Sequence, residues 1–167
     1  RNHSSAASDV YKRQSFNIEP GKTFGLVGES GSGKSTIARA ILRLTPAAAG
    51  SIKVSGDEVT EMNPHREKEY RSQVQVVFQD PYSSLNPSHV VGEIVGELIT
   101  QHRGVRAGSE RDQIVGDLLE QVGLGRHFME RFPYELSGGQ RQRVAIARAL
   151  SVQPETVSYT HLRAHET

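Results

Sequence analysis

The sequence predicts an α/β core that carries an inserted helical subdomain. Short apolar runs bounded by turn residues occupy the first half, a helical pattern extends from about Val90 to Pro133, and another helix is expected over Gly139–Leu150. Apolar runs of about four to eight residues are typical of buried strands, whereas apolar residues three and four positions apart are typical of helices. The expected order is therefore strands, a helical insert and a further helix.

The expected strands lie mainly in the first half of the chain. Pro20–Gly21 reads as a turn, and Pro46 and Gly50 are expected to end the first helix. The expected elements here are strands at Ser15–Glu19, Thr23–Val27, Ser51–Val54 and Val74–Phe78, a helix at Ser35–Leu44, and a polar run at Gly56–Arg71.

The helical subdomain is expected over about residues 88–135. Its clearest helix has Ser109 as the expected N-cap and Gly123 just past its end, since serine caps helix starts and glycine accepts the left-handed conformation that follows helix ends. One apolar face of this helix is formed by Ile114, Val115, Leu118, Leu119 and Val122.

The amino-acid composition limits the classes of function that the chain can have. The 167 residues fit one globular domain, with 35% hydrophobic and 23% charged residues and no cysteine. No apolar run approaches the roughly 20 residues of a membrane span. If the protein acts at a membrane, another subunit would have to span it. The formal charge of +1 gives no support for nucleic-acid binding, and we expect no nucleic-acid partner.

Both ends of the chain carry an unusual pattern. Asp9–Gln14 can be encoded by a DNA segment whose complement encodes Val157–His161, and this string resembles a transposon-end adapter used for sequencing libraries. We therefore expect residues 1–14 and 157–167 to be artefact without stable packing on the core. Residues 15–156 are expected to be a domain fragment, incomplete at both ends.

A glycine-rich octapeptide matches the phosphate-loop pattern G-x-x-x-x-G-K-[ST] in full. Glycine permits backbone turns that point successive N–H groups at phosphates, and the following helix adds its positive dipole end. Lys34 is expected at the β- and γ-phosphates, the Ser35 hydroxyl at Mg²⁺, and Thr36 at the α-phosphate. The expected nucleotide-binding residues are Gly28, Glu29, Ser30, Gly31, Ser32, Gly33, Lys34, Ser35 and Thr36.

A second anion-binding helix start is expected at Ser137. This residue occupies an N-cap position before a helix that opens with Gly138 and Gly139. Taken alone, Ser-Gly-Gly is equally consistent with a flexible cap.

The segment Leu136–Gln140 and its following helix resemble the signature of ABC ATPases. The resemblance covers nearly all of Ser15–Glu155 and implies a phosphate-loop NTPase core of the ABC ATPase type. In that family two domains pair head to tail, and the signature of one closes over the γ-phosphate bound by the other. The resemblance places Ser137, Gly138, Gly139 and Gln140 at the partner's ATP.

Gln79 follows the expected strand Val74–Phe78. Alone, it reads as a polar residue at a strand end. The resemblance implies that Gln79 contacts Mg²⁺ and the attacking water, so that Lys34 and Gln79 are the expected catalytic residues and Ser35 and Gln79 the expected metal contacts.

Two segments are similar to the ATP-binding subunits of oligopeptide and dipeptide importers, namely Phe78–Pro87 and Arg131–Glu135. Nickel and glutathione importers share the first segment, so the cargo stays open. The resemblance implies a peripheral protein at the cytoplasmic face of the plasma membrane. It also implies ATP and Mg²⁺ as cofactors, and a second ABC ATPase subunit and membrane-spanning permease subunits as partners.

One family feature is missing. The family has an apolar strand ending in Asp-Glu shortly after the position of Pro154–Glu155, where this chain has Thr156–Leu162 without an acidic pair. We therefore expect the 167-residue chain to be inactive in ATP hydrolysis, its catalytic glutamate being absent.

Three alternatives remain: a non-catalytic nucleotide-binding fragment, a soluble ABC protein and a phosphate-loop kinase. The signature segment argues against the kinase, and the segment after Gln79 argues against the soluble ABC protein. Arg141, Arg143 and Arg148 are interpreted as a solvated or interface helix face.

Overall fold

A computed structural model describes residues 15–29, 31–78 and 84–160. The chain divides into two units, residues 1–34 and 35–167. The expectations for residues 1–14, Ser30, Gln79 and 161–167 fall outside the described residues.

The described residues of the first unit up to Gly33 form extended chain and turns. Residues 15–29 form no strand, so the predicted strands at Ser15–Glu19 and Thr23–Val27 are wrong. A strand is stabilised by a hydrogen-bonded partner, whereas the described backbone here makes turn bonds such as Lys22 N–H to Glu19 O at 3.1 Å. Phe16 and Phe24 stack with ring centroids 4.9 Å apart, but both remain nearly half exposed.

Helix α2 spans Lys34–Ile41, starting one residue before the predicted start and ending before the predicted Leu44. The physical cause of the early end is Arg43, whose φ of +55° lies in the left-handed region. Leu44 N–H donates to Arg39 O at 2.8 Å and Arg43 N–H to Ala40 O at 3.0 Å. This is the Schellman pattern of bonds that closes a helix, here without glycine.

The predicted strand at Ser51–Val54 is confirmed over Lys53–Val54. The predicted polar run contains two elements that sequence reasoning did not assign, a strand at Asp57–Glu58 and a helix at Pro64–Gln73. Strands β1 (Lys53–Val54) and β2 (Asp57–Glu58) form an antiparallel hairpin across Ser55 and Gly56, whose φ values are +52° and +90°. Positive φ at both turn residues is typical of a type I′ hairpin.

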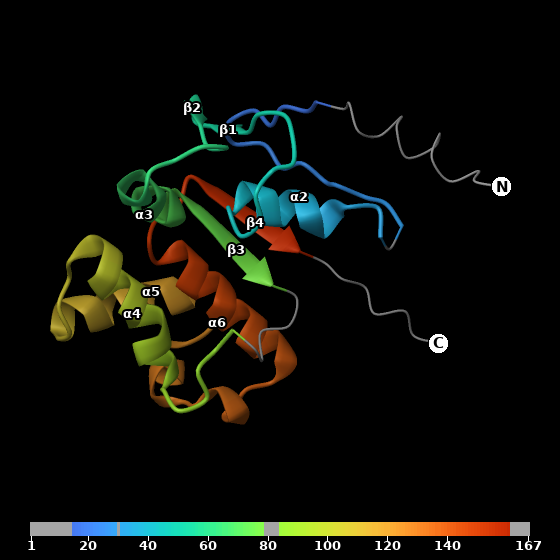
Figure 1. Cartoon of the computed structure of the whole chain (residues 1–167). Helices are drawn as coiled ribbons and strands as arrows, with labels where there is room; N and C mark the ends of the chain where they lie inside the picture. The colour runs from blue at the N-terminus through green and yellow to red at the C-terminus, as the bar shows by residue number, and fades with distance from the viewer. Residues whose placement is uncertain (1–14, 30, 79–83, 161–167) are drawn as a thin grey trace. The chain divides into compact units, whose positions relative to one another are not determined.

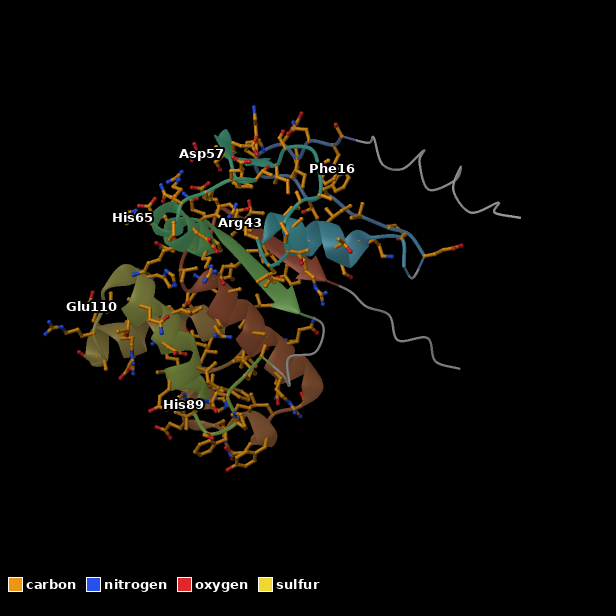
Figure 2. The ribbon with its side chains drawn as sticks, in the orientation of Figure 1. Phe16, Arg43, Asp57, His65, His89 and Glu110 are labelled. Atoms are coloured by element: carbon orange, nitrogen blue, oxygen red, sulfur yellow. The ribbon has the colours of Figure 1, made fainter. Side chains whose placement is uncertain are left out.

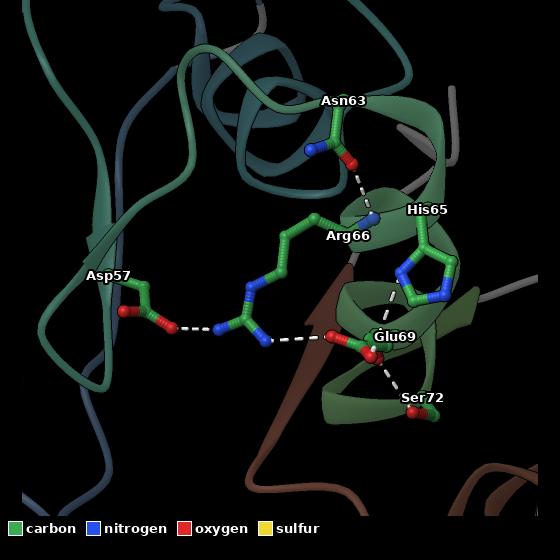
Figure 3. Close-up of polar contacts among 6 residues, drawn as sticks. All are labelled: Asp57, Asn63, His65, Arg66, Glu69 and Ser72. Carbon is green, nitrogen blue, oxygen red and sulfur yellow. Dashed lines mark hydrogen bonds and ion pairs between the residues drawn. The ribbon is translucent and has the colours of Figure 1, made fainter.

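Helix α3 spans Pro64–Gln73 and begins at Asn63, whose side chain accepts from Arg66 N–H at 2.9 Å. The Arg66 guanidinium is bound by Asp57 of β2 and by Glu69 of α3 (Figure 3). These carboxylates, Glu69 foremost, raise the pKa of Arg66. The buried residues Val59, Tyr70 and Val74, called the hairpin cluster below, form the core beneath α3.

Strand β3 spans Val74–Phe78 as predicted and pairs in parallel with β4, Thr156–Thr160 (Figure 1). Val74 pairs with Thr156 and Phe78 with Thr160. The expectation that residues 157–167 do not pack is therefore wrong for 157–160. Threonine, valine and tyrosine favour strands, and an unpaired strand edge accepts such a segment.

The remaining helices pack around one core. Their bounds are α4 Val91–Arg103, α5 Ser109–Gln121, η1 Arg126–Glu130, η2 Pro133–Glu135 and α6 Gly138–Leu150. Their buried side chains, called the helical core, are Leu85, Val91, Ile94, Val95, Ile99, Val115, Leu119, Leu124, Leu136, Val144 and Ala147.

Helix α5 shows the predicted apolar face, since Val115 and Leu119 are fully buried and its other members pack against them. Gly123 follows the helix with φ +74°, as expected. The N-cap is Gly108 rather than the predicted Ser109, because Gly108 has φ +148° and Ser109 is already helical.

Candidate nucleotide site

The described part of the phosphate loop has the conformation that its glycines predicted. Gly31 and Gly33 have φ of +81° and +92°, where an L side chain is strained. A Cβ on either would meet nothing within 4 Å, so backbone conformation alone requires glycine there. Gly28 differs, because its Cβ would lie 2.8 Å from Ser32 Oγ.

Lys34 is held against the loop by hydrogen bonds from its ammonium group. Lys34 Nζ donates to Gly28 O at 2.7 Å, to Glu29 O at 2.5 Å and to Ser32 Oγ at 3.0 Å. The ammonium therefore lies at the loop itself, where an anion bound by loop N–H groups would meet a positive charge.

Ser35 and Thr36 follow Lys34 directly in the chain as the first turn of α2. Ser35 is half-buried and Thr36 is exposed. The first N–H groups of a helix have no partner within it, and the helix dipole makes this end positive. A helix start of this kind favours a bound anion.

The signature segment forms the predicted capped helix start. Ser137 Oγ accepts from Gln140 N–H at 3.3 Å, and Gln140 Oε1 accepts from Ser137 N–H at 2.9 Å. Ser137, Gly138 and Gly139 are exposed, and a Cβ on either glycine would meet nothing within 4 Å. The helix start is therefore accessible to an anion at close range.

The residues before the signature are tied down by Glu135. Its carboxylate accepts from Phe132 N–H at 2.7 Å and from the Arg131 guanidinium at 2.9 Å. These two bonds, the backbone one foremost, lower the pKa of Glu135 from its ordinary 4.5. The carboxylate is ionised at neutral pH and holds η2 in place ahead of Ser137.

The predicted solvated or interface face of α6 is wrong for Arg141, which is buried, whereas Arg143 is exposed. Arg141 is only 7% exposed and donates to Leu136 O at 2.6 Å. Arg143 donates to Gly123 O at 3.1 Å, and Arg148 to Ser84 O at 3.0 Å. A guanidinium on a helix reaches carbonyls of neighbouring segments, so these side chains fix α6 to its surroundings.

The described residues contain neither a metal-binding cluster nor a membrane-spanning helix. His65 Nδ1 lies 3.9 Å from Glu69 Oε1 (Figure 3). Among the described residues, no group of three or more His, Cys, Asp or Glu side chains could hold a metal ion. No described helix combines the length and apolarity needed to cross a membrane.

A phosphate loop, a capped Ser-Gly-Gly helix start and an α/β core define an ATP-binding cassette. The chain belongs to the ABC transporter family, whose model matches residues 11–158.

Its relatives include peptide transport proteins. The chain is 46% identical over 143 residues to the oligopeptide transport ATP-binding protein OppF of Streptococcus mutans, covering 86% of this chain and 46% of the relative. It is also 46% identical over 153 residues to the dipeptide transport ATP-binding protein DppF of Lactococcus lactis, covering 90% and 49%. The chain thus spans about half the length of these curated relatives.

Solved structures support the same fold. A dimeric, post-hydrolysis ATP-binding cassette, MJ0796 bound to ADP and Pi, matches with a TM-score of 0.76 at 33% identity, covering 86% of this chain and 62% of that one. This confirms the predicted fold class.

Proposed function

We propose that this chain is the nucleotide-binding part of an ABC importer subunit for peptides, which couples ATP hydrolysis to transport in the intact protein. The observation that carries the proposal is the loop itself: two glycines at positive φ and an ammonium bonded to the loop carbonyls, followed at once by α2. The 46% identity to oligopeptide and dipeptide transport ATP-binding proteins supports the cargo class.

Different groups of the loop bind different parts of the ATP phosphates. The backbone N–H groups of Glu29, Gly31 and Gly33 bind the phosphates in this proposal, whereas Ser32 N–H donates to Glu29 O at 3.2 Å. Lys34 exchanges loop carbonyls for phosphate oxygens, which is favourable because charge-assisted bonds to phosphate are stronger than those to neutral carbonyls. Thr36 contacts the α-phosphate.

Mg²⁺ fits the donor chemistry present. Ser35 offers a half-buried hydroxyl on the first turn of α2, and Gln79, which follows β3 in sequence, offers an amide oxygen. Oxygen ligands of this kind, shared with phosphates, are what Mg²⁺ prefers. When bound, the ion neutralises charge on the phosphates.

Ser137, Gly138, Gly139 and Gln140 act in trans, at ATP held by a second ABC ATPase subunit in a head-to-tail dimer. The exposed, capped start of α6 supports this role. Permease subunits provide the membrane passage, and the ATPase lies at the cytoplasmic face of the plasma membrane. Residues 15–156 constitute the ABC domain, with a helical subdomain at about 88–135.

The 167-residue chain by itself hydrolyses ATP slowly. Strand β4, Thr156–Thr160, carries no carboxylate to polarise the attacking water. General-base help of that kind is commonly worth about 10²–10⁴-fold. The chain is therefore a nucleotide binder rather than an efficient ATPase.

ATP-dependent dimerisation tests the trans role. Light scattering should show that ATP shifts the chain from monomer toward dimer. Gly138→Asp places a carboxylate at the helix start and should abolish the shift, because it repels the partner's γ-phosphate. Ser109→Asp makes the same charge change at the exposed start of α5 and should leave the shift intact. A dimer that forms equally with Gly138→Asp would contradict the role.

Hydrolysis and cargo need a second experiment. The chain is compared with a version extended through a strand ending in Asp-Glu and the family's switch histidine, each with peptide-importer permease subunits in vesicles. The extended version should release phosphate faster and take up labelled peptide. Equal Mg²⁺-dependent release from both versions, abolished by Lys34→Ala, would refute the slow-hydrolysis proposal.

A further inference from the structure

Helix α2 is held mainly at its C-terminal end. None of its eight residues is buried. At its last turn, however, Ile41 and Leu42 pack against the hairpin cluster. Because Ser35 and Thr36 lie at the opposite end of the same short helix, the direction of α2 depends on how this last turn is fixed.

Tyr70 of α3 binds that turn directly. Its hydroxyl donates to Ile41 O at 2.7 Å, and the side chain is only 2% exposed. Ile41 O is one of the last carbonyls of α2 and has no partner within the helix, so this bond satisfies it. Burial raises the pKa of Tyr70 to about 12, which keeps the hydroxyl a donor at neutral pH.

Arg43, labelled in Figure 2, binds the same turn to a second segment. Its guanidinium donates to Val59 O at 2.5 Å and to Thr60 O at 2.9 Å, and lies 3.9 Å from Glu67 of α3. Since Arg43 also ends α2 in the left-handed conformation, backbone and side chain together fix the exit of the helix.

We propose that Tyr70 and Arg43 are positioning residues of the nucleotide site, which set the direction of α2 and thereby the place of Ser35. This inference rests on the proposed function. A helix of eight residues is about 12 Å long, so a tilt of about 5° at its C-terminal end moves its first turn by about 1 Å. Displacements of about 1 Å at a reacting centre can cost about 10²-fold.

A purely structural role for the two side chains makes a different prediction. Loss of stability lowers the folded fraction, and this raises the apparent Kd for any ligand by the same factor. The ratio of the Kd for ATP in EDTA to that in Mg²⁺ is independent of the folded fraction. The ratio falls only if the position of the group that contacts Mg²⁺ changes. In the proposed site, that group is the Ser35 hydroxyl.

The experiment measures this ratio with a fluorescent ATP analogue on the full chain. Tyr70→Phe removes the hydroxyl and keeps the ring, and Arg43→Lys keeps the charge but loses the bridge to two carbonyls. Tyr70→Phe and Arg43→Lys should each lower the ratio of the Kd in EDTA to the Kd in Mg²⁺ about threefold or more. The matched controls are Tyr134→Phe, at a tyrosine that is 69% exposed, and Arg39→Lys, at an exposed arginine of α2. Both controls should retain the wild-type ratio.

The possible outcomes distinguish a failure of the proposed function from a failure of the positioning role. A wild-type chain that does not bind the analogue overturns the proposed function and this inference with it. Binding that Lys34→Ala weakens, together with wild-type ratios in Tyr70→Phe and Arg43→Lys, overturns the positioning role alone. Reduced ratios in the controls as well would also overturn it, because the effect would then not be specific to the turn.

Discussion

Replacing Lys34 by alanine tests the nucleotide site most directly. The side chain has three hydrogen bonds, to Gly28 O, Glu29 O and Ser32 Oγ. The substitution removes the ammonium that would bind phosphate and also releases the loop from these acceptors. ATP affinity should therefore fall, while the helical core, which contains no residue of the loop, remains unchanged.

The size of the effect follows from the kind of bond lost. A hydrogen bond to a charged group contributes about 1.5–3 kcal/mol, and about 1.4 kcal/mol corresponds to a tenfold change in Kd. Lys34→Ala should weaken ATP binding about 10- to 150-fold. The midpoint of thermal unfolding should move little, since substitutions at the surface commonly change stability by less than about 0.5 kcal/mol.

Isothermal titration of ATP measures this change. Lys22→Ala is the matched control, because it removes an exposed lysine from the turn after Glu19 in the same unit. It should bind ATP as the wild type does. Unchanged ATP affinity in folded Lys34→Ala, or an equal loss in Lys22→Ala, would refute the reasoning.

Three further predictions concern stability. Leu119→Ala, at a fully buried side chain of α5, should lower the free energy of unfolding in urea by about 2–5 kcal/mol. Ser137→Ala removes the cap of α6 and should cost about 1 kcal/mol in the same assay. Glu135 has a lowered pKa in the folded chain, so its stabilising effect is present above pH 4.5 and is lost as the pH falls through the folded-state value. Glu135→Gln should therefore flatten the dependence of stability on pH below 4.5.

Controls decide these three predictions. Leu44→Ala, at a side chain that is 61% exposed, should cost much less than Leu119→Ala. Ser109→Ala should be nearly neutral, because Ser109 follows the N-cap of α5 instead of occupying it. Equal losses of stability in Leu44→Ala and Leu119→Ala would contradict the assigned burial. Equal losses in Ser109→Ala and Ser137→Ala would contradict the assigned cap. For Glu135→Gln, a decline in stability below pH 4.5 as steep as that of the wild type would contradict the role of its bonds.

Expectations that depended on neighbouring residues in the chain were mostly confirmed. The positive φ of Gly31 and Gly33, the start of α2 near Lys34 and the capped start of α6 each depend on bonds that span only a few residues. Periodicity likewise identified the apolar face of α5, because one helical face repeats every three or four residues.

Among the expectations that depended on distant partners, the strands at Val74–Phe78 and, in part, Ser51–Val54 were confirmed. Others failed or were never made. Thr23–Val27 has strand composition but no strand partner among the described residues, whereas β2 lies in a polar run without an apolar pattern. Ser55–Gly56 and Asn63–Pro64 were the available signals for the hairpin and for the start of α3.

The sequence by itself therefore determined the phosphate loop and the signature cap, since their chemistry and conformation are encoded within single short segments. Tertiary structure alone decided that β4 pairs with β3, and that Tyr70 reaches Ile41, 29 residues away. Composition cannot specify such pairs, because many partners could satisfy the same carbonyl or strand edge. The free energy of the whole packed unit selects one of them.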